Sequence, residues 1–296
     1  MNLPSAFLTR MQEMLGEEYE AFLQSYESGH YQSLRLNPRK TDREEFTEKS
    51  PFHLTPVAWE KNGFYYSEED TPGKHPYHEA GVYYIQEASA MAPVGYLDVQ
   101  PGDYVLDLCA APGGKTILLA EQMQGTGALY SCDAAENRVG LIRTAVDRMG
   151  FTGVHTLCND ATKPNPALPM ADRILTDVPC SGLGILAKKP DLRYKKLEAA
   201  RQAELLATQA AILDTAAALL KAGGRLVYST CTIDPAENQQ QIAAFLQRHP
   251  EFAVCAPEVP LPAGMTAGEH GCLSVPTRTG MDGFFLCVLQ KAAATQ

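Results

Sequence analysis

The pattern of hydrophobic and polar positions changes near residue 100 of the chain. Before it, residues 3–28 carry apolar side chains at three- and four-residue spacings with acids between them, which predicts a helix. The residues that follow, to about position 75, are irregular and contain many Pro, Gly and aromatic residues. We therefore predict a small α+β N-terminal domain over residues 1–75.

After residue 100, apolar runs of strand length alternate with amphipathic stretches and glycine-rich breaks. The runs are "YVLDLC", "ALYSC", "VHTLC", "RILTDV", "RLVYSTC" and the C-terminal "GFFLCVLQ", with an Ala-rich helix expected over residues 197–221. This alternation predicts βαβ units and a parallel sheet, which makes the second domain α/β over residues 76–291, followed by a tail at 292–296. Ligands of such sheets bind at the carboxyl ends of the strands.

Composition limits the class of protein. The chain has 296 residues, is 45% hydrophobic and 20% charged, and contains no apolar run long enough to span a bilayer. Its N-terminus lacks the features of a signal peptide, and its eight cysteines form no C-x-x-C pair. We therefore expect a cytoplasmic protein with reduced thiols, no membrane association and no metal, since the H-x-x-H spacing of His75 and His78 is a weak signal.

The charge distribution bears on nucleic-acid binding. A formal net charge of −10 argues against indiscriminate binding to phosphates. Two local clusters are nevertheless basic, "RLNPRKTDR" at residues 35–43 and "KKPDLRYKKLEAAR" at residues 188–201. Either cluster alone is equally well explained as a solvated surface.

The stretch "VLDLCAAPGGKT", residues 105–116, combines a strand, a tight turn and the start of a helix. It lacks the first glycine of a P-loop and the G-x-G-x-x-G of a dinucleotide fold. Acids end the first three strands, at Asp107, Asp133 and Asp160. A turn of small residues beside acids suits a cofactor without phosphates, and the three carboxylates suit the amino group, ribose and adenine amine of S-adenosylmethionine.

Two cysteines end two further strands, in "DVPCSGLG" and "YSTCT". Together with "CAAPGGKT", these motifs resemble the Nop/Sun family of RNA cytosine-C5 methyltransferases over nearly the whole chain. "LPSAFLTRMQEML", "SLRLNPRK" and "HPYHEAGVYYIQEASAM" further resemble the branch that modifies small-subunit ribosomal RNA. The resemblance implies a Rossmann-like methyltransferase domain, with a mostly parallel seven-stranded sheet and an antiparallel last strand, behind an RNA-binding N-terminal domain.

The residue types fit this chemistry. C5 of cytosine is a poor nucleophile, so a thiolate must first add at C6, and a later step must remove the C5 proton and release the enzyme. An enzyme that methylates an exocyclic nitrogen needs no thiol, whereas this chain carries Pro179-Cys180-Ser181 after its fourth strand. Carbon methylation is therefore favoured.

The resemblance also implies roles for individual residues. Cys231 would be the nucleophile, Cys180 would assist release, and Asp177 and Lys115 would contact the cytosine or the donor. S-adenosylmethionine would be bound by Cys109, Ala110, Ala111, Pro112, Gly113, Gly114, Lys115, Asp133, Arg138, Asp160 and Asp177. Pro179, Lys188 and Lys189 would contact the RNA, whose target base must be unstacked to enter the pocket.

Three alternatives remain open at this point. The same chemistry serves transfer RNA, and a noncatalytic RNA-binding or ribosome-assembly factor could use the same scaffold, although a scaffold has no need of both thiols. DNA methylation fits less well, because similar DNA enzymes use the Pro-Cys thiol as nucleophile and have no counterpart of Cys231. Members of the branch usually continue into further RNA-binding modules, whereas this sequence ends at Gln296.

Overall fold

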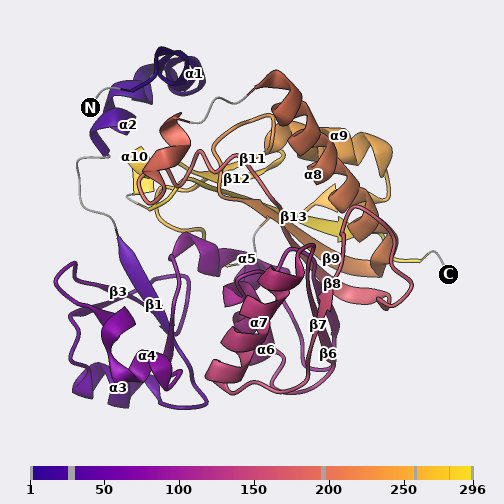
Figure 1. Ribbon diagram of the computed structural model, residues 1–296. Helices are drawn as coiled ribbons and strands as arrows, with labels where there is room; N and C mark the ends of the chain where they lie inside the picture. Colours follow the sequence, from indigo (N-terminus) through magenta and orange to yellow (C-terminus); the bar gives the residue numbers. More distant parts are fainter. Residues whose placement is uncertain (1–2, 26–30, 195–197, 257–258, 280, 295–296) are drawn as a thin grey trace.

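The computed structural model describes residues 3–25, 31–194, 198–256, 259–279 and 281–294, which form two sheets with helices around them (Figure 1). The smaller sheet, as far as these residues show it, has four antiparallel strands in the order β2-β3-β1-β4. Its elements are β1 (Gln32–Leu36), α3 (Arg43–Lys49), β2 (Leu54–Pro56), β3 (Gly63–Tyr66), η2 (Pro72–Lys74), α4 (Pro76–Glu79) and β4 (Tyr83–Ile85). Phe46, Phe64 and Tyr83 are buried together against β1, so this unit has a core of its own.

Within the described residues the larger sheet has nine strands, of which five are parallel in the order β7-β6-β5-β8-β9. These five are β5 (Tyr104–Asp107), β6 (Ala128–Asp133), β7 (Val154–Cys158), β8 (Ala171–Asp177) and β9 (Leu220–Thr230). Antiparallel strands extend the sheet past β9: β13 (Phe284–Lys291), β12 (Gly271–Ser274), β11 (Thr266–Gly268) and, paired with β13, β10 (Phe252–Val254).

The predicted fold class is confirmed, because all six apolar runs form strands and the last is antiparallel. The predicted number of seven strands is wrong. Strands β10, β11 and β12 have only three or four residues each; β11 and β12 form a hairpin within residues 256–282, a stretch rich in Pro and Gly that favours a hairpin before the last strand.

Helices cover both faces of the large sheet, and alternate residues of each strand face opposite layers. On β5, Val105 belongs to the core under α5 (Ala92–Leu97), α6 (Gly114–Gln122) and α7 (Glu136–Met149), whereas Leu106 belongs to the core under α8 (Ala199–Leu219) and α9 (Gln239–Arg248). The Ala-rich helix expected over residues 197–221 is therefore present as α8, and residue 197 lies outside the described part. Of the described helices, none has the length and apolar character needed to cross a membrane.

The N-terminal helical segment packs against the larger unit rather than against the small sheet (Figure 1). It consists of α1 (Ser5–Leu15), η1 (Gly16–Glu18) and α2 (Tyr19–Ser25), and the single helix predicted for residues 3–28 is broken at Gly16, which has a φ of 53°. Residues 26–28 lie outside the described part. Phe7 and Phe22 form a core with Leu183 and Ile233, residues of the loops after β8 and β9. These loops carry the two predicted catalytic cysteines.

The small sheet is tied to the larger unit by buried polar contacts. The Arg35 side chain is fully buried and forms an ion pair with Glu121 of α6, and Asn62 Nδ2 donates to Glu121 Oε1 at 2.7 Å. Arg35, one of the four basic residues of the 35–43 cluster, is therefore not available to a phosphate. The predicted division of the chain after residue 75 stays a prediction, although β4 follows that point and pairs with β1.

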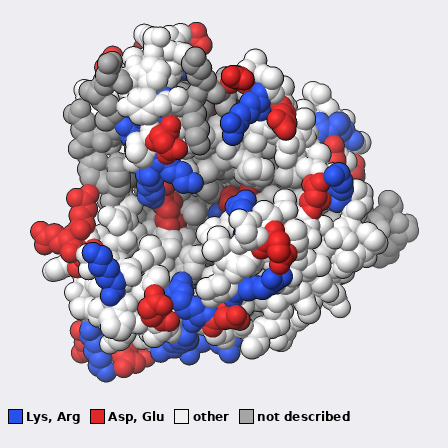
Figure 2. All heavy atoms as spheres, in the orientation of Figure 1, with Lys and Arg blue, Asp and Glu red and all other residues white. Residues whose placement is uncertain are grey.

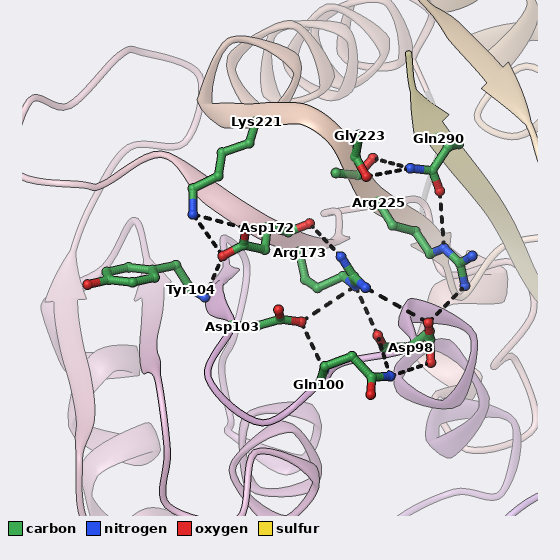
Figure 3. Close-up of polar contacts among 11 residues, drawn as sticks. Asp98, Gln100, Asp103, Tyr104, Asp172, Arg173, Lys221, Gly223, Arg225 and Gln290 are labelled. Atoms are coloured by element: carbon green, nitrogen blue, oxygen red, sulfur yellow. Dashed lines mark hydrogen bonds and ion pairs between the residues drawn. The ribbon is translucent and has the colours of Figure 1, made fainter. Parts of the chain in front are cut away.

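A polar network lies at the amino ends of β5 and β8 and the adjoining part of β9 (Figure 3). The Arg173 side chain lies 3.8 Å from an Asp98 carboxylate oxygen and 3.7 Å from one of Asp103. Lys221 Nζ donates to both Asp172 oxygens at 2.9 Å, and Asp172 Oδ2 accepts from the backbone N–H of residue 104. These ion pairs join strands at the edge of the sheet opposite to the strand ends that carry the predicted site.

Candidate active site

The loop after β5 begins the site. The Ala110 N–H donates to the Cys132 carbonyl at 2.8 Å, which fixes the loop against β6. Gly113 has a φ of 112° and precedes α6, and a Cβ atom there would lie 3.3 Å from the Ala145 side chain. A glycine is therefore required at this turn, because the conformation is one that L side chains rarely adopt.

A cavity of about 220 Å³ lies against this loop. Its lining includes seven of the residues predicted to bind the donor: Cys109, Ala110, Ala111, Pro112, Gly114, Lys115 and Asp177. Tyr84 and Gln86, which belong to β4 and the residue after it, also line the cavity and were missed from the sequence. The small sheet thus contributes to the donor side of the site, a long-range contact that no local pattern signals.

Asp107 is the buried acid of this cavity. Its side chain is fully buried, Thr116 Oγ1 donates to Oδ2 at 2.8 Å, and Oδ1 has no hydrogen-bond partner among the residues that the structure describes. Burial raises the pKa of Asp107 to about 7, against the lowering effect of the Thr116 hydrogen bond. An unpartnered buried carboxylate oxygen in a cavity is suited to bind a donor or cation of a ligand. Burial likewise raises the pKa of the neighbouring Cys109 thiol.

The two other acids predicted to bind the donor are placed differently. Asp133 is buried at the end of β6 and pairs with Arg138, whose nitrogen lies 3.3 Å from Oδ2. Asp160 is exposed and caps its own turn, because it accepts from Thr162 and pairs with Lys163 at 2.8 Å. The Lys163 and Thr162 hydrogen bonds lower the pKa of Asp160 to about 2. Four of the residues predicted to bind the donor do not line the 220 Å³ cavity: Gly113, Asp133, Arg138 and Asp160.

Lys115 and Asp177 form an ion pair between α6 and the end of β8. Lys115 Nζ lies 2.8 Å from Asp177 Oδ2, and Ser229 Oγ donates to Asp177 Oδ1 at 2.7 Å. Burial by itself would lower the pKa of Lys115, but the Asp177 carboxylate outweighs it and raises that pKa. Lys115 therefore stays charged at the edge of the cavity.

The two predicted catalytic thiols meet at the adjacent strand ends. Cys180 Sγ and Cys231 Sγ are 3.1 Å apart, and both side chains are partly buried. The hydrogen bond with Cys231, followed by burial, raises the pKa of Cys180 well above its ordinary value. Cys180 is therefore held as a thiol beside the Cys231 sulfur.

Backbone contacts hold the loop after Cys180 close to Cys231. The Gly184 N–H donates to the Cys231 carbonyl at 3.0 Å, and the Gly283 N–H donates to the Gly184 carbonyl at 2.8 Å. A Cβ atom at Gly184 would lie only 1.9 Å from the Gly283 carbonyl oxygen, so no side chain fits there. The "SGLG" sequence thus permits the close approach of three backbone segments.

Glu237 also positions the Cys180 loop, although no motif of the sequence singles it out. Its side chain is buried, and Oε2 accepts from the Ser181 N–H and from Gln209 Nε2, both at 2.9 Å. Gln209 Nε2 also donates to the Pro179 carbonyl at 2.9 Å. The available signal was an acid in "DPAENQQQ", a polar stretch directly after "YSTCT".

The residues predicted to contact RNA lie on the surface beside this loop. Pro179 and Lys189 are exposed, and Lys188 Nζ pairs with Asp282 Oδ2 at 2.8 Å. Lys188 thus has an acidic partner within the protein. Lys195 and Lys196 of the same basic cluster lie outside the described residues. Within the described chain, no group of His, Cys, Asp and Glu side chains is suited to hold a metal ion.

The arrangement of the larger sheet is that of a Rossmann-like methyltransferase domain, with the site at the carboxyl ends of its parallel strands. Comparison with known families identifies the group. Residues 94–290 match the family described as 16S rRNA methyltransferase RsmB/F, and residues 3–88 match the N-terminal domain of 16S rRNA methyltransferase RsmF. The chain belongs to the RsmB/F family.

Curated relatives agree with this membership. The chain is similar to the "Probable ribosomal RNA small subunit methyltransferase B" of Bacillus subtilis, with 37% identity over 88% of this chain and 60% of the relative. It is also similar to the "Ribosomal RNA small subunit methyltransferase F" of Erwinia tasmaniensis, with 34% identity over 98% of this chain and 64% of the relative. The chain thus spans about three fifths of the length of these relatives.

Solved structures share the fold over nearly the whole chain. The crystal structure of PH0851 has 32% identity and a TM-score of 0.89, covering 98% of this chain and 66% of that one. A methyltransferase homolog protein from Pyrococcus horikoshii has 27% identity and a TM-score of 0.81, covering 98% of this chain and all of that one. Both similarities extend over the small sheet as well as the large one.

Proposed function

We propose that the protein is an S-adenosylmethionine-dependent RNA cytosine-C5 methyltransferase that acts on 16S ribosomal RNA. The contact between Cys180 and Cys231 carries this proposal. A methyltransferase fold with two thiols 3.1 Å apart, next to a charged Lys115–Asp177 pair, has the groups that methylation of a pyrimidine carbon requires.

The cavity beside the loop after β5 is suited to the amino-acid part of the methyl donor. It offers a buried carboxylate oxygen without a partner at Asp107, a turn of small residues and no phosphate-binding glycine motif. We propose that Asp107 binds the amino group of the amino-acid part and that Asp133, paired with Arg138, binds the ribose. S-adenosylmethionine would supply an electrophilic methyl group bound to a sulfonium sulfur.

The two cysteines act in different steps of the reaction at the base. The Cys231 thiolate adds to C6 of cytosine, which places electron density on C5 and makes that carbon nucleophilic. After C5 has been methylated, loss of the C5 proton restores the C5–C6 double bond and expels the Cys231 thiolate. Cys180 completes this step: its S–H proton passes to the departing Cys231 sulfur 3.1 Å away, and the Cys180 thiolate so formed takes up the C5 proton.

Lys115 and Asp177 position the base and stabilise charge. Ser229 and Lys115 hold the Asp177 carboxylate from two sides, so that its orientation is fixed before a substrate enters. A carboxylate accepts hydrogen bonds only, which suits the exocyclic amine of cytosine and not the carbonyl of uracil. Lys115 in turn provides a positive charge that interacts electrostatically with Cys231.

The names of the curated relatives support ribosomal RNA over transfer RNA, since each is described as a small-subunit ribosomal RNA methyltransferase. The surface is compatible with RNA despite the net charge of −10. Figure 2 shows acidic and basic side chains interspersed over one face, with basic side chains gathered along its lower edge. RNA phosphates would contact this basic edge.

Incubation of the protein with labelled S-adenosylmethionine and unmodified 16S ribosomal RNA tests the proposal. We expect 5-methylcytosine at one or a few positions, detected by bisulfite sequencing, and none in a parallel reaction with unmodified transfer RNA. Label in transfer RNA alone would support the alternative substrate. Donor binding without methylation of either RNA, or of the small subunit assembled from unmodified RNA, would support the noncatalytic alternative.

A further inference from the structure

We propose that a second cavity, on the other side of Cys180, binds the nucleotide that adjoins the target cytosine in the RNA strand. This inference rests on the proposed function. The cavity has a volume of about 550 Å³ and is bounded by α1, the Cys180 loop, η4 (Pro190–Tyr194) and α8. It is therefore large enough for a nucleoside with its phosphate.

The two cavities flank the pair of thiols without sharing a residue. Asp177 and Lys115 line the donor cavity, whereas Cys180 and Leu183 line the larger one. The target base must lie against Cys231 and the donor, on the Asp177 side. A group in the larger cavity would touch Cys180, whose sulfur is 3.1 Å from that of Cys231. The part of the substrate joined most closely to the target base is its neighbour in the strand.

The lining of the larger cavity combines aromatic and cationic groups. Its charged residues are three arginines, at positions 10, 193 and 201, and one acid, Glu204. Tyr194 is 56% exposed, and neither its hydroxyl nor the Arg201 guanidinium makes a hydrogen bond or ion pair within the described chain. Phe7 and Leu205 add apolar surface. Aromatic faces beside cations are the usual means of binding single-stranded nucleic acid without sequence preference.

The N-terminal helix α1 forms one side of this cavity. Phe7 belongs to α1 and is buried against Leu183, and Arg10 of the same helix pairs with Asp234, three residues after Cys231. These contacts anchor α1 to the loops of both cysteines, so that one side of the cavity is formed before RNA binds. A preformed cavity lowers the conformational entropy lost when a flexible strand is bound.

The test measures methyl transfer to unmodified 16S ribosomal RNA for Tyr194→Ala, Tyr194→Phe and Arg201→Ala. We expect Tyr194→Ala to raise KM about tenfold, because it removes the ring on which one base stacks, and Tyr194→Phe to retain the wild-type KM, because it keeps that ring. Arg201→Ala should raise KM and reduce the salt dependence of RNA binding by about one ion. Donor affinity should stay unchanged in each variant.

Two substitutions far from this cavity are the matched controls. Tyr104→Ala removes an exposed tyrosine at the opposite edge of the sheet, and Arg143→Ala removes an arginine of α7. Both variants should keep the wild-type KM. A wild-type KM in Tyr194→Ala and Arg201→Ala would overturn the inference. The inference would also be overturned if these two variants were less active on assembled small subunits but fully active on naked RNA. That result would indicate that a protein, and not a nucleotide, occupies the cavity. Failure of the proposed function can be told apart from these outcomes, because the wild-type protein itself would then produce no 5-methylcytosine.

Discussion

Cys180 Sγ and Cys231 Sγ lie 3.1 Å apart although 51 residues separate them in the chain. The contact arises because β8 and β9 are parallel neighbours, with Asp177 opposite Ser229, so that the loops after both strands leave the sheet at the same edge. Glu237, Gln209 and the Gly184 backbone then hold the first loop against the second. The thiol pair is thus a product of sheet register and loop anchoring together.

Replacement of Glu237 tests the anchoring of the Cys180 loop. Glu237→Ala leaves the Ser181 N–H and the Gln209 amide without their buried acceptor, which should cost about 2–3 kcal/mol of stability. We expect kcat for methyl transfer to fall at least tenfold with little change in donor affinity. Glu237→Gln keeps a carbonyl oxygen for both donors and should restore most of kcat. Equal losses in the two variants would show that the charge, and not the hydrogen bonds, matters.

Replacement of Gly184 tests the close approach of the three backbone segments. In Gly184→Ala the new methyl group would lie 1.9 Å from the Gly283 carbonyl oxygen, so the loop must move away from Cys231. We expect a loss of about 1–3 kcal/mol in the free energy of unfolding and a lower kcat. Gly140→Ala on α7 is the matched control, since nothing lies within 4 Å of its Cβ position, and it should be neutral or stabilising. Unchanged activity in Gly184→Ala would contradict the packing described.

Asp107 should make the stability of the ligand-free protein depend on pH. Its pKa is about 7 in the folded protein and ordinarily 3.8, so between these values the folded state holds a proton that the unfolded chain has lost. The free energy of unfolding should therefore fall as the pH rises from about 4 to 7, by up to about 4 kcal/mol from this group. Asp107→Asn removes this contribution, and denaturant unfolding at several pH values measures the difference. Identical pH dependence in the two proteins would refute the assignment.

The sequence predicted the parts of the site that depend on strand ends. The apolar runs located β5, β8 and β9, and the motifs after them placed Cys109, Lys115, Asp177, Cys180 and Cys231 at one edge of the sheet. The pattern could not distinguish an acid that enters a cavity from one that caps its own turn. Asp107 and Asp160 both follow apolar strands, yet one is buried in the donor cavity and the other is exposed and paired with Lys163.

The features that the sequence did not predict depend on contacts between distant segments of the chain. The packing of Phe7 against Leu183 joins residues far apart in the chain, and neither position has a distinctive local signal. Arg35 belongs to a run of basic residues that suggests a surface, but the small sheet buries it against Glu121. Glu237 reads in the sequence as one polar residue among several, and only the meeting of three loops gives it a function in positioning.

The division of labour between the two thiols is tested most directly by trapping the covalent intermediate. Each cysteine is replaced by serine, each variant is incubated with S-adenosylmethionine and unmodified 16S ribosomal RNA, and the products are separated under denaturing conditions. We predict that Cys180→Ser accumulates a protein–RNA adduct that survives denaturation, whereas Cys231→Ser forms no adduct, transfers no methyl group and still binds the donor. A stable adduct from Cys231→Ser would contradict the assignment of Cys231 as the nucleophile.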